Sequence, residues 1–277
     1  MKTAVVTDAQ LPLAGLRVLV TRPAHQAAAW QQLLLSEGAA VVSVPLLDIV
    51  PFTAESGAPW HALRSRIQDL DYYRHLIFVS QNAVRLGMER VLEYWPQLPL
   101  RLQFYAVGAA TAAALRDYDV NVSEAGEGMN SEALLQLAGL QQVDQQRILI
   151  FRGAGGRPTL GQELADRGAR VDYCELYERR LPAAATTKLA LLAESGSDLI
   201  VSVHSGETLQ NLRRLISELA NNGILNPLEW LQRPLLVPGE RVAQLAAESG
   251  FRQVIVANNA SDRSMLDALL EWRRNAE

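Results

Sequence analysis

Hydrophobic residues along this chain gather into short runs that alternate with segments of helical period. Such runs begin at Leu16–Val20, His75–Ser80, Arg147–Arg152 and Asp198–His204. Each run leads through a turn into a segment with apolar residues every three or four positions, as in the helix predicted over His25–Glu37. Alternating strands and helices predict parallel sheets with right-handed crossovers. We therefore expect an α/β protein.

Two extended segments do not fit a sheet interior. Arg170–Pro182 reads R-V-D-Y-C-E-L-Y-E-R-R-L-P, which is too polar for a buried parallel strand. Ala40–Pro51 contains Pro45 inside its apolar run, as an edge or connecting strand would. Together the two segments predict a two-stranded hinge between lobes. The side chains expected on one face of the first segment are Val171, Tyr173, Glu175 and Tyr177.

Part of the chain occurs twice. The run R-V-L-V-T-R at Arg17–Arg22 resembles R-I-L-I-F-R at Arg147–Arg152, and in both places a helix, a Gly-Ala pair and a hinge segment follow. Such a repeat indicates an internal duplication. A constant offset along this stretch relates Arg17 to Arg147, Gly38 to Gly168 and Leu46 to Leu176.

The turns between strands and helices are rich in small and polar residues. Open α/β sheets bind ligands at the carboxyl ends of their strands, where helix N-termini expose N–H groups. The same residues also make good helix caps, so a single turn decides nothing. Two sets of four turns joined by a hinge favour a large anionic ligand. The eight turns read T-R-P, S-Q-N, G-A-A-T, G-M-N-S, R-G-A-G-G-R, H-S-G-E, P-G-E-R and N-A-S-D.

Composition narrows the class of protein. The chain has 277 residues, of which 49% are hydrophobic, enough for two ordinary cores. No apolar run reaches the roughly 20 residues of a membrane helix, and the first residues do not form a secretory signal. A net charge of −4 argues against a general nucleic-acid binder. The single cysteine, Cys174, suits a reducing compartment, so we expect a cytoplasmic protein.

Candidate chemistry is sparse. The four histidines show no metal-ligand spacing with one another or with Cys174, so no metal site is expected. The turn Arg152–Arg157 lacks the Lys-Ser/Thr of a phosphate-binding P-loop, but its three glycines permit close approach of an anion. Cys174 fits packing better than nucleophilic chemistry. Tyr177 is the one candidate acid on the hinge, and a packed aromatic residue is the alternative interpretation.

Several motifs in order resemble the uroporphyrinogen-III synthase family. The resemblance runs from about Leu16 to Leu270, and the order and spacing of the motifs are more specific than any one of them. The motifs are V-T-R-P at the first turn, F-V-S-Q-N-A-V at Phe78–Val84, Y-A-V-G-A-A-T-A at Tyr105–Ala112, N-S-E-A-L-L at Asn130–Leu135, R-I-L-I-F-R-G-A-G-G-R at Arg147–Arg157, and the hinge G-A-R-V-D-Y-C-E-L-Y-E-R-R.

The resemblance implies two flavodoxin-like parallel-sheet lobes joined by a two-stranded β hinge. Lobe 1 would comprise residues 1–43 and 182–277, lobe 2 residues 53–169, and the hinge strands 44–52 and 170–181. The implied reaction closes linear hydroxymethylbilane into uroporphyrinogen III, with loss of water and inversion of the last pyrrole ring. The resemblance also implies no cofactor, a monomer, and at most a transient contact with hydroxymethylbilane synthase.

The resemblance assigns roles to individual residues. The family's hinge tyrosine corresponds to Tyr177, which is expected to be catalytic. Two departures from the family pattern are Pro238–Arg241, which lacks a Ser or Thr and brings the acidic Glu240, and His204, where a small hydroxyl residue is more usual. The expected substrate-binding residues are Arg22, Ser80, Gln81, Asn82, Gly108, Thr111, Ser131, Arg152, Gly153, Gly155, Arg157, Ser205, Gly239 and Arg241.

One alternative from another class stays open at this point. The turns alone fit equally well a two-lobed binding or sensor protein that closes on an anionic metabolite without converting it. Only the product formed from hydroxymethylbilane distinguishes the two.

Overall fold

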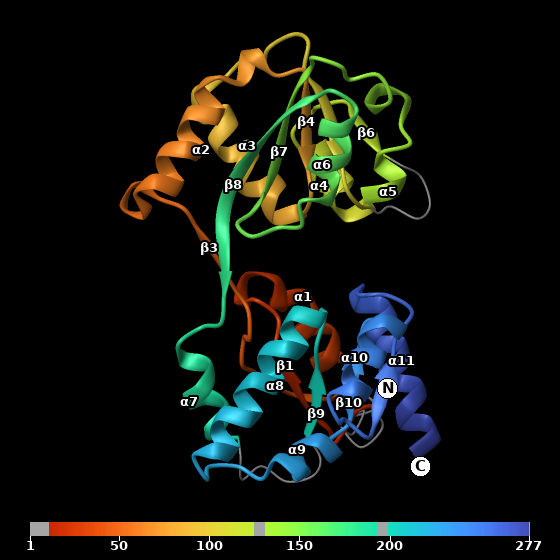
Figure 1. Cartoon of the computed structure of the whole chain (residues 1–277). Helices are drawn as coiled ribbons and strands as arrows, with labels where there is room; N and C mark the ends of the chain where they lie inside the picture. The colour runs from red at the N-terminus through yellow and green to blue at the C-terminus, as the bar shows by residue number, and fades with distance from the viewer. Residues whose placement is uncertain (1–10, 125–130, 193–198, 277) are drawn as a thin grey trace, which may run out of the picture. The chain divides into compact units, whose positions relative to one another are not determined.

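The computed structural model describes residues 11–124, 131–192 and 199–276. The chain divides into two compact units, each a sheet flanked by helices (Figure 1). Unit 1 comprises Met1–Asp48 and Arg180–Glu277, and unit 2 comprises Ile49–Arg179. Within the described residues, no helix is both long and apolar enough to cross a membrane.

Unit 1 contains a five-stranded sheet in the order β11-β10-β9-β1-β2, with all neighbours parallel. If the strands are renumbered 1 to 5 in chain order within the unit, from β1 to β11, the sheet order starting at the β2 edge is 2-1-3-4-5. This is the flavodoxin-like order. Its elements are β1 (Arg17–Val20), α1 (Ala24–Ser36), β2 (Ala40–Ser43), α7 (Ala184–Ala190), β9 (Leu199–Ser202), α8 (Gly206–Asn221), α9 (Pro227–Gln232), β10 (Leu235–Val237), α10 (Glu240–Glu248), β11 (Val254–Val256) and α11 (Asp262–Ala276).

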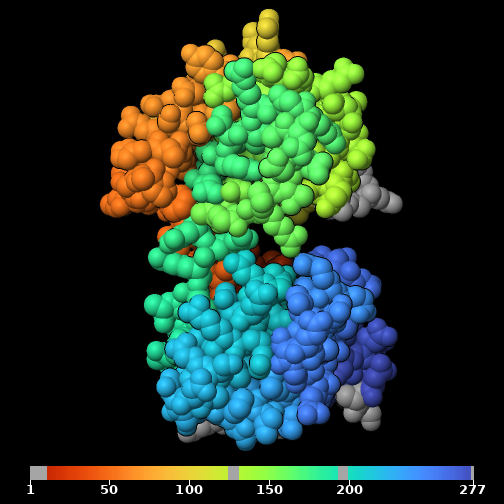
Figure 2. Space-filling view, in the orientation of Figure 1, coloured from red at the N-terminus to blue at the C-terminus, as the bar shows by residue number. Residues whose placement is uncertain are grey.

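Helices cover both faces of this sheet because successive strand residues point to opposite sides. Leu19 and Val201 pack on one face with residues of α8, α9 and α10. Val18 and Ile200 pack on the other with α1 and α11, where Trp30 is fully buried. In the space-filling view, the visible face of unit 1 is formed mainly by the segments after β8, coloured cyan to blue (Figure 2).

Unit 2 contains a six-stranded sheet in the order β3-β8-β7-β4-β5-β6. The neighbours from β8 to β6 are parallel and repeat the order of unit 1, and β3 adds an outer edge. Its elements are β3 (Asp48–Pro51), α2 (Ala58–Gln68), β4 (His75–Phe78), α3 (Gln81–Tyr94), β5 (Gln103–Ala106), α4 (Ala109–Arg116), β6 (Val122–Glu124), α5 (Ser131–Leu134), β7 (Arg147–Gly153), α6 (Thr159–Asp166), β8 (Arg170–Arg180) and the 3₁₀ turns Ala54–Ser56, Leu70–Tyr72 and Ala138–Leu140.

The faces of this second sheet are also both covered. Phe78 and Phe151 stack with ring centroids 4.4 Å apart on the face packed by α2, α3 and α4. Ile77 and Ile150 point to the opposite face, with α5 and α6. Cys174 is fully buried beside the two phenylalanines, and burial raises the pKa of its thiol, which confirms the packing interpretation.

The predicted α/β class, with a flavodoxin-like parallel sheet in each unit, and the internal repeat are both confirmed. Strands β1 and β7 occupy the same place in their sheets, as do β2 and β8. The helix that follows each first strand ends just before a glycine with positive φ: Gly38 at +92° and Gly168 at +86°. After the edge strand β3 and helix α2, the flavodoxin-like part of unit 2 begins with β4, the third strand of that order, because β7 and β8, its first and second strands, come last along the chain.

Two details of the extended segments differ from the prediction. The stretch Ala40–Pro51 is not one strand: β2 belongs to the sheet of unit 1 and β3 to that of unit 2. In β8, Tyr177 does not continue the face of Tyr173, because the pairing with β7 shifts register between Arg152 and Gly153. This bulge turns Tyr177 into the apolar cluster that contains Leu176.

Candidate active site

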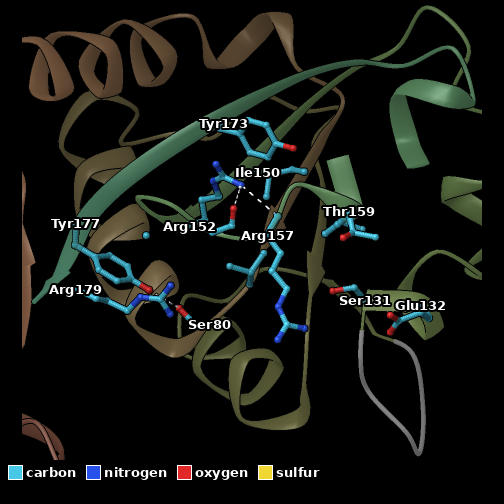
Figure 3. A pocket seen from close by; sticks show the side chains of 14 residues that line it. Ser80, Ser131, Glu132, Ile150, Arg152, Arg157, Thr159, Tyr173, Tyr177 and Arg179 are labelled. Atoms are coloured by element: carbon cyan, nitrogen blue, oxygen red, sulfur yellow. Dashed lines mark hydrogen bonds between the residues drawn. The ribbon is translucent and has the colours of Figure 1, made fainter. Parts of the chain in front are cut away.

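A pocket of about 290 Å³ lies at the carboxyl edge of the sheet in unit 2, among the ends of β4, β7 and β8 and the starts of α5 and α6 (Figure 3). The strand order reverses between β7 and β4, and open α/β sheets bind ligands at such a switch point. Six of the predicted site residues line this pocket: Ser80, Ser131, Arg152, Gly153, Arg157 and Tyr177.

A hydroxyl pair occupies one end of the pocket. Tyr177 is only 4% exposed, and its hydroxyl oxygen lies 3.1 Å from Ser80 Oγ. Ser80 is the N-cap of α3, where its Oγ accepts a hydrogen bond of 3.1 Å from the Ala83 N–H. Two hydroxyls have two protons, and only one is used between them. In either orientation, the pair retains one O–H to donate to a ligand.

Gly153 determines where the Tyr177 ring lies. A Cβ built at position 153 would come within 2.6 Å of Tyr177 Cε2 and 2.8 Å of its Cζ. Real Cβ atoms do not approach a ring that closely, so any other residue here displaces the ring. The glycine that was predicted as an anion contact therefore also positions the tyrosine.

Arg152 is occupied by protein partners. Its Nε and Nη2 donate to Glu175 Oε1 over 3.2 and 2.9 Å, and its Nη1 donates to the carbonyls of Gly156 and Arg157 over 3.0 and 3.3 Å. Its guanidinium carbon also lies 3.8 Å from the centroid of the Tyr173 ring. Arg152 therefore holds the glycine-rich turn in place, and few of its donors are left for a ligand.

Other charges face the same pocket. The guanidinium of Arg157 makes no hydrogen bond or ion pair with any described residue, and Figure 3 shows it extending from the turn into the pocket. Arg179 on β8 adds a second cation to the lining, and Ser131 adds a hydroxyl at the start of α5. Glu132 is the acid in the lining. The pocket lining thus combines the two cations, Arg157 and Arg179, with the hydroxyl pair.

The remaining predicted residues of unit 2 do not line this pocket. Gln81 and Asn82 begin α3, Gly108 with φ +94° precedes α4, and Thr111 is 5% exposed within α4. Gly155 has φ +69° and open space around the position of a Cβ. Residues 128–130 of the turn G-M-N-S lie outside the described residues.

The predicted residues of unit 1 lie at the carboxyl edge of its own sheet. Arg22 forms an ion pair with Asp262 and donates to the Ala260 carbonyl over 3.2 Å, so it joins the turns after β1 and β11. Ser205 caps α8 by accepting from the Thr208 N–H over 3.1 Å. The other two begin α10: Gly239 with φ +129° is its N-cap, and Arg241 is exposed.

His204 lies at the switch point of unit 1, between the end of β9 and the cap of α8. Neither ring nitrogen reaches solvent or has a hydrogen-bond partner among the described residues. Its ring meets Trp30 edge-on with centroids 5.6 Å apart. Burial, with a smaller contribution from nearby Arg22, lowers the pKa of His204 to about 3, so the imidazole is neutral at neutral pH.

Some site residues were not predicted. Tyr173, Arg179, Thr159 and Glu132 line the pocket, and each lies within two residues of a predicted turn or hinge position, so proximity was an available signal. The ion pair of Arg22 with Asp262 had no such signal because its members are far apart in the chain. Among the described residues, no group of three or more His, Cys, Asp or Glu side chains could hold a metal ion.

Two flavodoxin-order sheets, with a polar, cation-lined pocket at a switch point, define a two-unit α/β protein built to bind an anionic ligand. A family model described as "Uroporphyrinogen-III synthase HemD" matches residues 28–267. The chain belongs to the uroporphyrinogen-III synthase family. The family predicted from the sequence motifs is therefore confirmed.

Individual relatives agree with this assignment. The chain is 34% identical over 259 residues to uroporphyrinogen-III synthase of Salmonella typhimurium, covering 91% of this chain and 99% of that protein. It is 33% identical over 257 residues to the enzyme of Escherichia coli, with the same coverage. The chain is thus an enzyme of the lyase class that acts in porphyrin biosynthesis, and a non-catalytic binding protein is not favoured.

Solved structures match the fold at lower identity. The uroporphyrinogen III synthase of Thermus thermophilus, in a mutant form, aligns with a TM-score of 0.62 at 19% identity, covering 95% of this chain and all of that one. The Helicobacter pylori protein aligns with a TM-score of 0.55 at 18% identity, covering 92% and 98% of the two chains. These similarities support the fold.

Proposed function

We propose that this chain converts hydroxymethylbilane to uroporphyrinogen III and that the Tyr177–Ser80 hydroxyl pair contacts the reacting end of the substrate. The observation that carries the residue assignment is the position of this pair: 3.1 Å apart, with one O–H left over, at the switch point of unit 2. The family membership supports the reaction itself.

The reaction needs one proton donor at its start. The terminal hydroxyl of the linear tetrapyrrole leaves as water, and an electrophilic azafulvene remains. A hydrogen bond from the spare O–H of the pair stabilises the charge on the departing oxygen. Attack by the substituted carbon of the last ring gives a spiro intermediate, which fragments and recloses with that ring inverted. The last ring finally loses one proton, so that the macrocycle and one molecule of water together contain all the atoms of the linear substrate.

Selecting the conformation matters more than acid strength. Closure without an enzyme attacks the free carbon and gives the unrotated isomer, so the site must hold the last ring in the less accessible orientation. Positioning of this kind contributes up to roughly 7–11 kcal/mol. One well-placed donor in a closed site contributes roughly 2.7–4 kcal/mol. A pocket with few acids and bases agrees with a reaction in which positioning of the substrate contributes more than proton donation.

The carboxylate arms require cations and N–H groups. We assign Arg157 and Arg179 as the pocket's charged contacts, with Ser131 and the backbone of the Gly153–Arg157 turn as neutral donors. Arg152 acts through this turn, since its donors are directed to Glu175 and to two carbonyls. A four-ring substrate exceeds about 290 Å³, so this pocket holds only part of it.

Contacts outside this pocket remain predictions. They include Gln81, Asn82, Gly108, Thr111 and Gly155 in unit 2. They also include the residues of unit 1: Arg22, Ser205, Gly239 and Arg241. A cytoplasmic location, a monomeric state, and a transient contact with hydroxymethylbilane synthase likewise belong to this proposal.

The test is the isomer of the product. Purified, chelator-treated protein should convert hydroxymethylbilane mainly to the rotated III isomer, as separated by chromatography. Formation of the I isomer alone, at the rate of a protein-free control, would reject the activity. A protein that slows spontaneous closure without changing the isomer would instead support the binding or sensor alternative.

A further inference from the structure

A second and larger cavity, of about 890 Å³, lies at the opposite edge of the sheet in unit 2. Four arginines line it, all at the amino-terminal ends of strands: Arg147 and Arg170 begin β7 and β8, and Arg74 and Arg101 precede β4 and β5. Strand β7 runs from this edge to the active-site pocket at Gly153, a separation of about 20 Å at the usual rise per residue. The two sites are therefore distinct.

The lining of this arginine groove carries no carboxylate among its described residues. Apart from the arginines it consists mainly of glutamine side chains, with Tyr72 at the rim and His75 in the floor. The chain as a whole has a net charge of −4, so the concentration of positive charge does not follow from the average composition. Burial lowers the pKa of His75, which leaves the arginines as the source of the charge.

Most N–H groups of these guanidinium side chains donate no hydrogen bond to the residues that the structure describes. Arg74 Nη1 donates to the Arg101 carbonyl over 2.9 Å, and Arg170 Nη2 donates to Gln145 Oε1 over 2.8 Å. Of the four, Arg147 is the one with an acidic partner in the described part of the chain, Asp172 at 3.1 Å. Each guanidinium has five N–H groups. The other three arginines thus have no carboxylate partner within the described residues and keep donors for a ligand.

The groove is built on rigid elements. His75 is 2% exposed, and its Nε2 lies 2.6 Å from Gln146 Oε1 while its Nδ1 lies 3.2 Å from the Tyr105 hydroxyl. Gln146 Nε2 in turn donates to the Gln142 carbonyl over 2.9 Å. Gln145, which orients Arg170, has φ +57°, a conformation that costs a non-glycine residue free energy and is concentrated at functional sites.

We propose that the arginine groove is a binding site for a small polyanion with two or more carboxylate or phosphate groups. Guanidinium forks match both groups with paired hydrogen bonds, and several like charges held around one cavity gain stability when an anion neutralises them. The volume falls in the usual range of small-molecule sites, roughly 300–1,000 Å³. Its ligand does not need to enter the active site.

The first experiment measures binding to the intact protein. Thermal melts with millimolar pyrophosphate or citrate are compared with melts in sodium chloride of equal ionic strength. A polyanion that binds the folded protein should raise Tm by about 2 °C or more beyond the salt control. A response to pyrophosphate alone assigns a phosphate ligand, and a response to citrate alone a carboxylate. No rise with either anion beyond the salt control overturns the proposal.

Variants and NMR locate the binding. Arg101→Gln with Arg170→Gln should abolish the Tm rise, while Arg64→Gln, an exposed arginine on α2, and Arg157→Gln in the active-site pocket should retain it. Only four histidines exist, so the His75 imidazole signal can be assigned and should shift with the ligand. If the double variant is unstable, Arg101→Gln alone should weaken the response several-fold. A Tm rise that survives in the groove variants, with an unmoved His75 signal, overturns the proposal.

Discussion

The ring of Tyr177 packs so closely on Gly153 that a single added methyl group has no room, since a Cβ would lie 2.6 Å from Tyr177 Cε2. The pair joins β7 and β8 at the register shift beside the pocket. Gly153→Ala should therefore displace the ring and lower the free energy of unfolding by about 1–3 kcal/mol. It should also reduce the rate of III-isomer formation as strongly as loss of the hydroxyl.

The matched control is Tyr177→Phe, which keeps both the ring and the glycine. Urea unfolding of both variants separates packing from chemistry: the phenylalanine variant should unfold within about 1 kcal/mol of wild type, for one lost hydrogen bond. A Gly153→Ala variant with wild-type stability and activity would show that the ring moves aside without consequence.

The hydroxyl pair itself makes a sharper prediction for catalysis. Tyr177→Phe should lower kcat by roughly 10- to 1000-fold, as expected for one donor in a closed site. Ser80→Ala should be milder, roughly 2- to 10-fold, because Tyr177 keeps its own proton. Since the two hydroxyls share one bond, the double variant should be little worse than Tyr177→Phe. If the Tyr177→Phe variant has activity within twofold of wild type, the Tyr177 hydroxyl is not catalytic and the residue serves only in packing.

Arg152 and Arg157 should respond differently to substitution. Arg152→Gln removes the bonds to Glu175 and to the turn carbonyls, so it should lower Tm, and its loss of activity should change little with salt. Arg157→Gln should leave Tm unchanged and raise KM about 3- to 10-fold at low ionic strength, with a smaller effect at high salt. Kinetics at two salt concentrations and parallel melts test both. Identical salt profiles would contradict the assignment.

Backbone recognition by the glycine-rich turn can be tested with two matched glycines. Gly155 and Gly223 both have φ of +69°, and both have open space where a Cβ would be. Alanine at either position should therefore cost a similar free energy of unfolding, about 1 kcal/mol. Only Gly155→Ala should also raise KM, since only that turn approaches the substrate. Equal kinetics for the two variants would mean that the turn does not bind the carboxylate arms.

Because burial lowers the pKa of His204, we expect the free energy of unfolding to depend on pH. Its pKa is about 3 in the folded protein against an ordinary 6.5, so both states are neutral above pH 6.5 and it has no effect there. Below that pH the unfolded chain takes up the proton first, and stability falls by about 1.4 kcal/mol per pH unit. The loss is about 2 kcal/mol between pH 6.5 and 5, and it continues towards pH 3.

Urea unfolding at pH 7.5 and 5.0 measures this contribution. His204→Gln should lose less stability on acidification than wild type, whereas His61→Gln, an exposed histidine on α2, should follow wild type. If acidification to pH 5.0 lowers the free energy of unfolding equally in all three proteins, the His204 imidazole is already protonated in the folded protein at that pH.

Much of the fold was predictable from the chain alone because the signals are local. The spacing of hydrophobic residues in each segment indicates which of its sides is buried. The strands, the helices and the turns between them could therefore be located along the sequence. The repeat of Gly38 at Gly168 marked two equivalent helix ends, both with positive φ. Cys174 was assigned to packing because it alternates with tyrosines along its strand, and it is fully buried.

The candidate site depended on distances that no local pattern contains. Ser80 and Tyr177 are brought to 3.1 Å because β8, β7 and β4 are neighbours in the sheet, and a register shift places Tyr177 opposite Gly153 at the edge of the pocket. The same assembly directs Arg152 to Glu175 and leaves Arg157 as the available cation. Local sequence determined which segments are strands and turns, while strand order and register, set by burial of the whole core, decided which side chains meet.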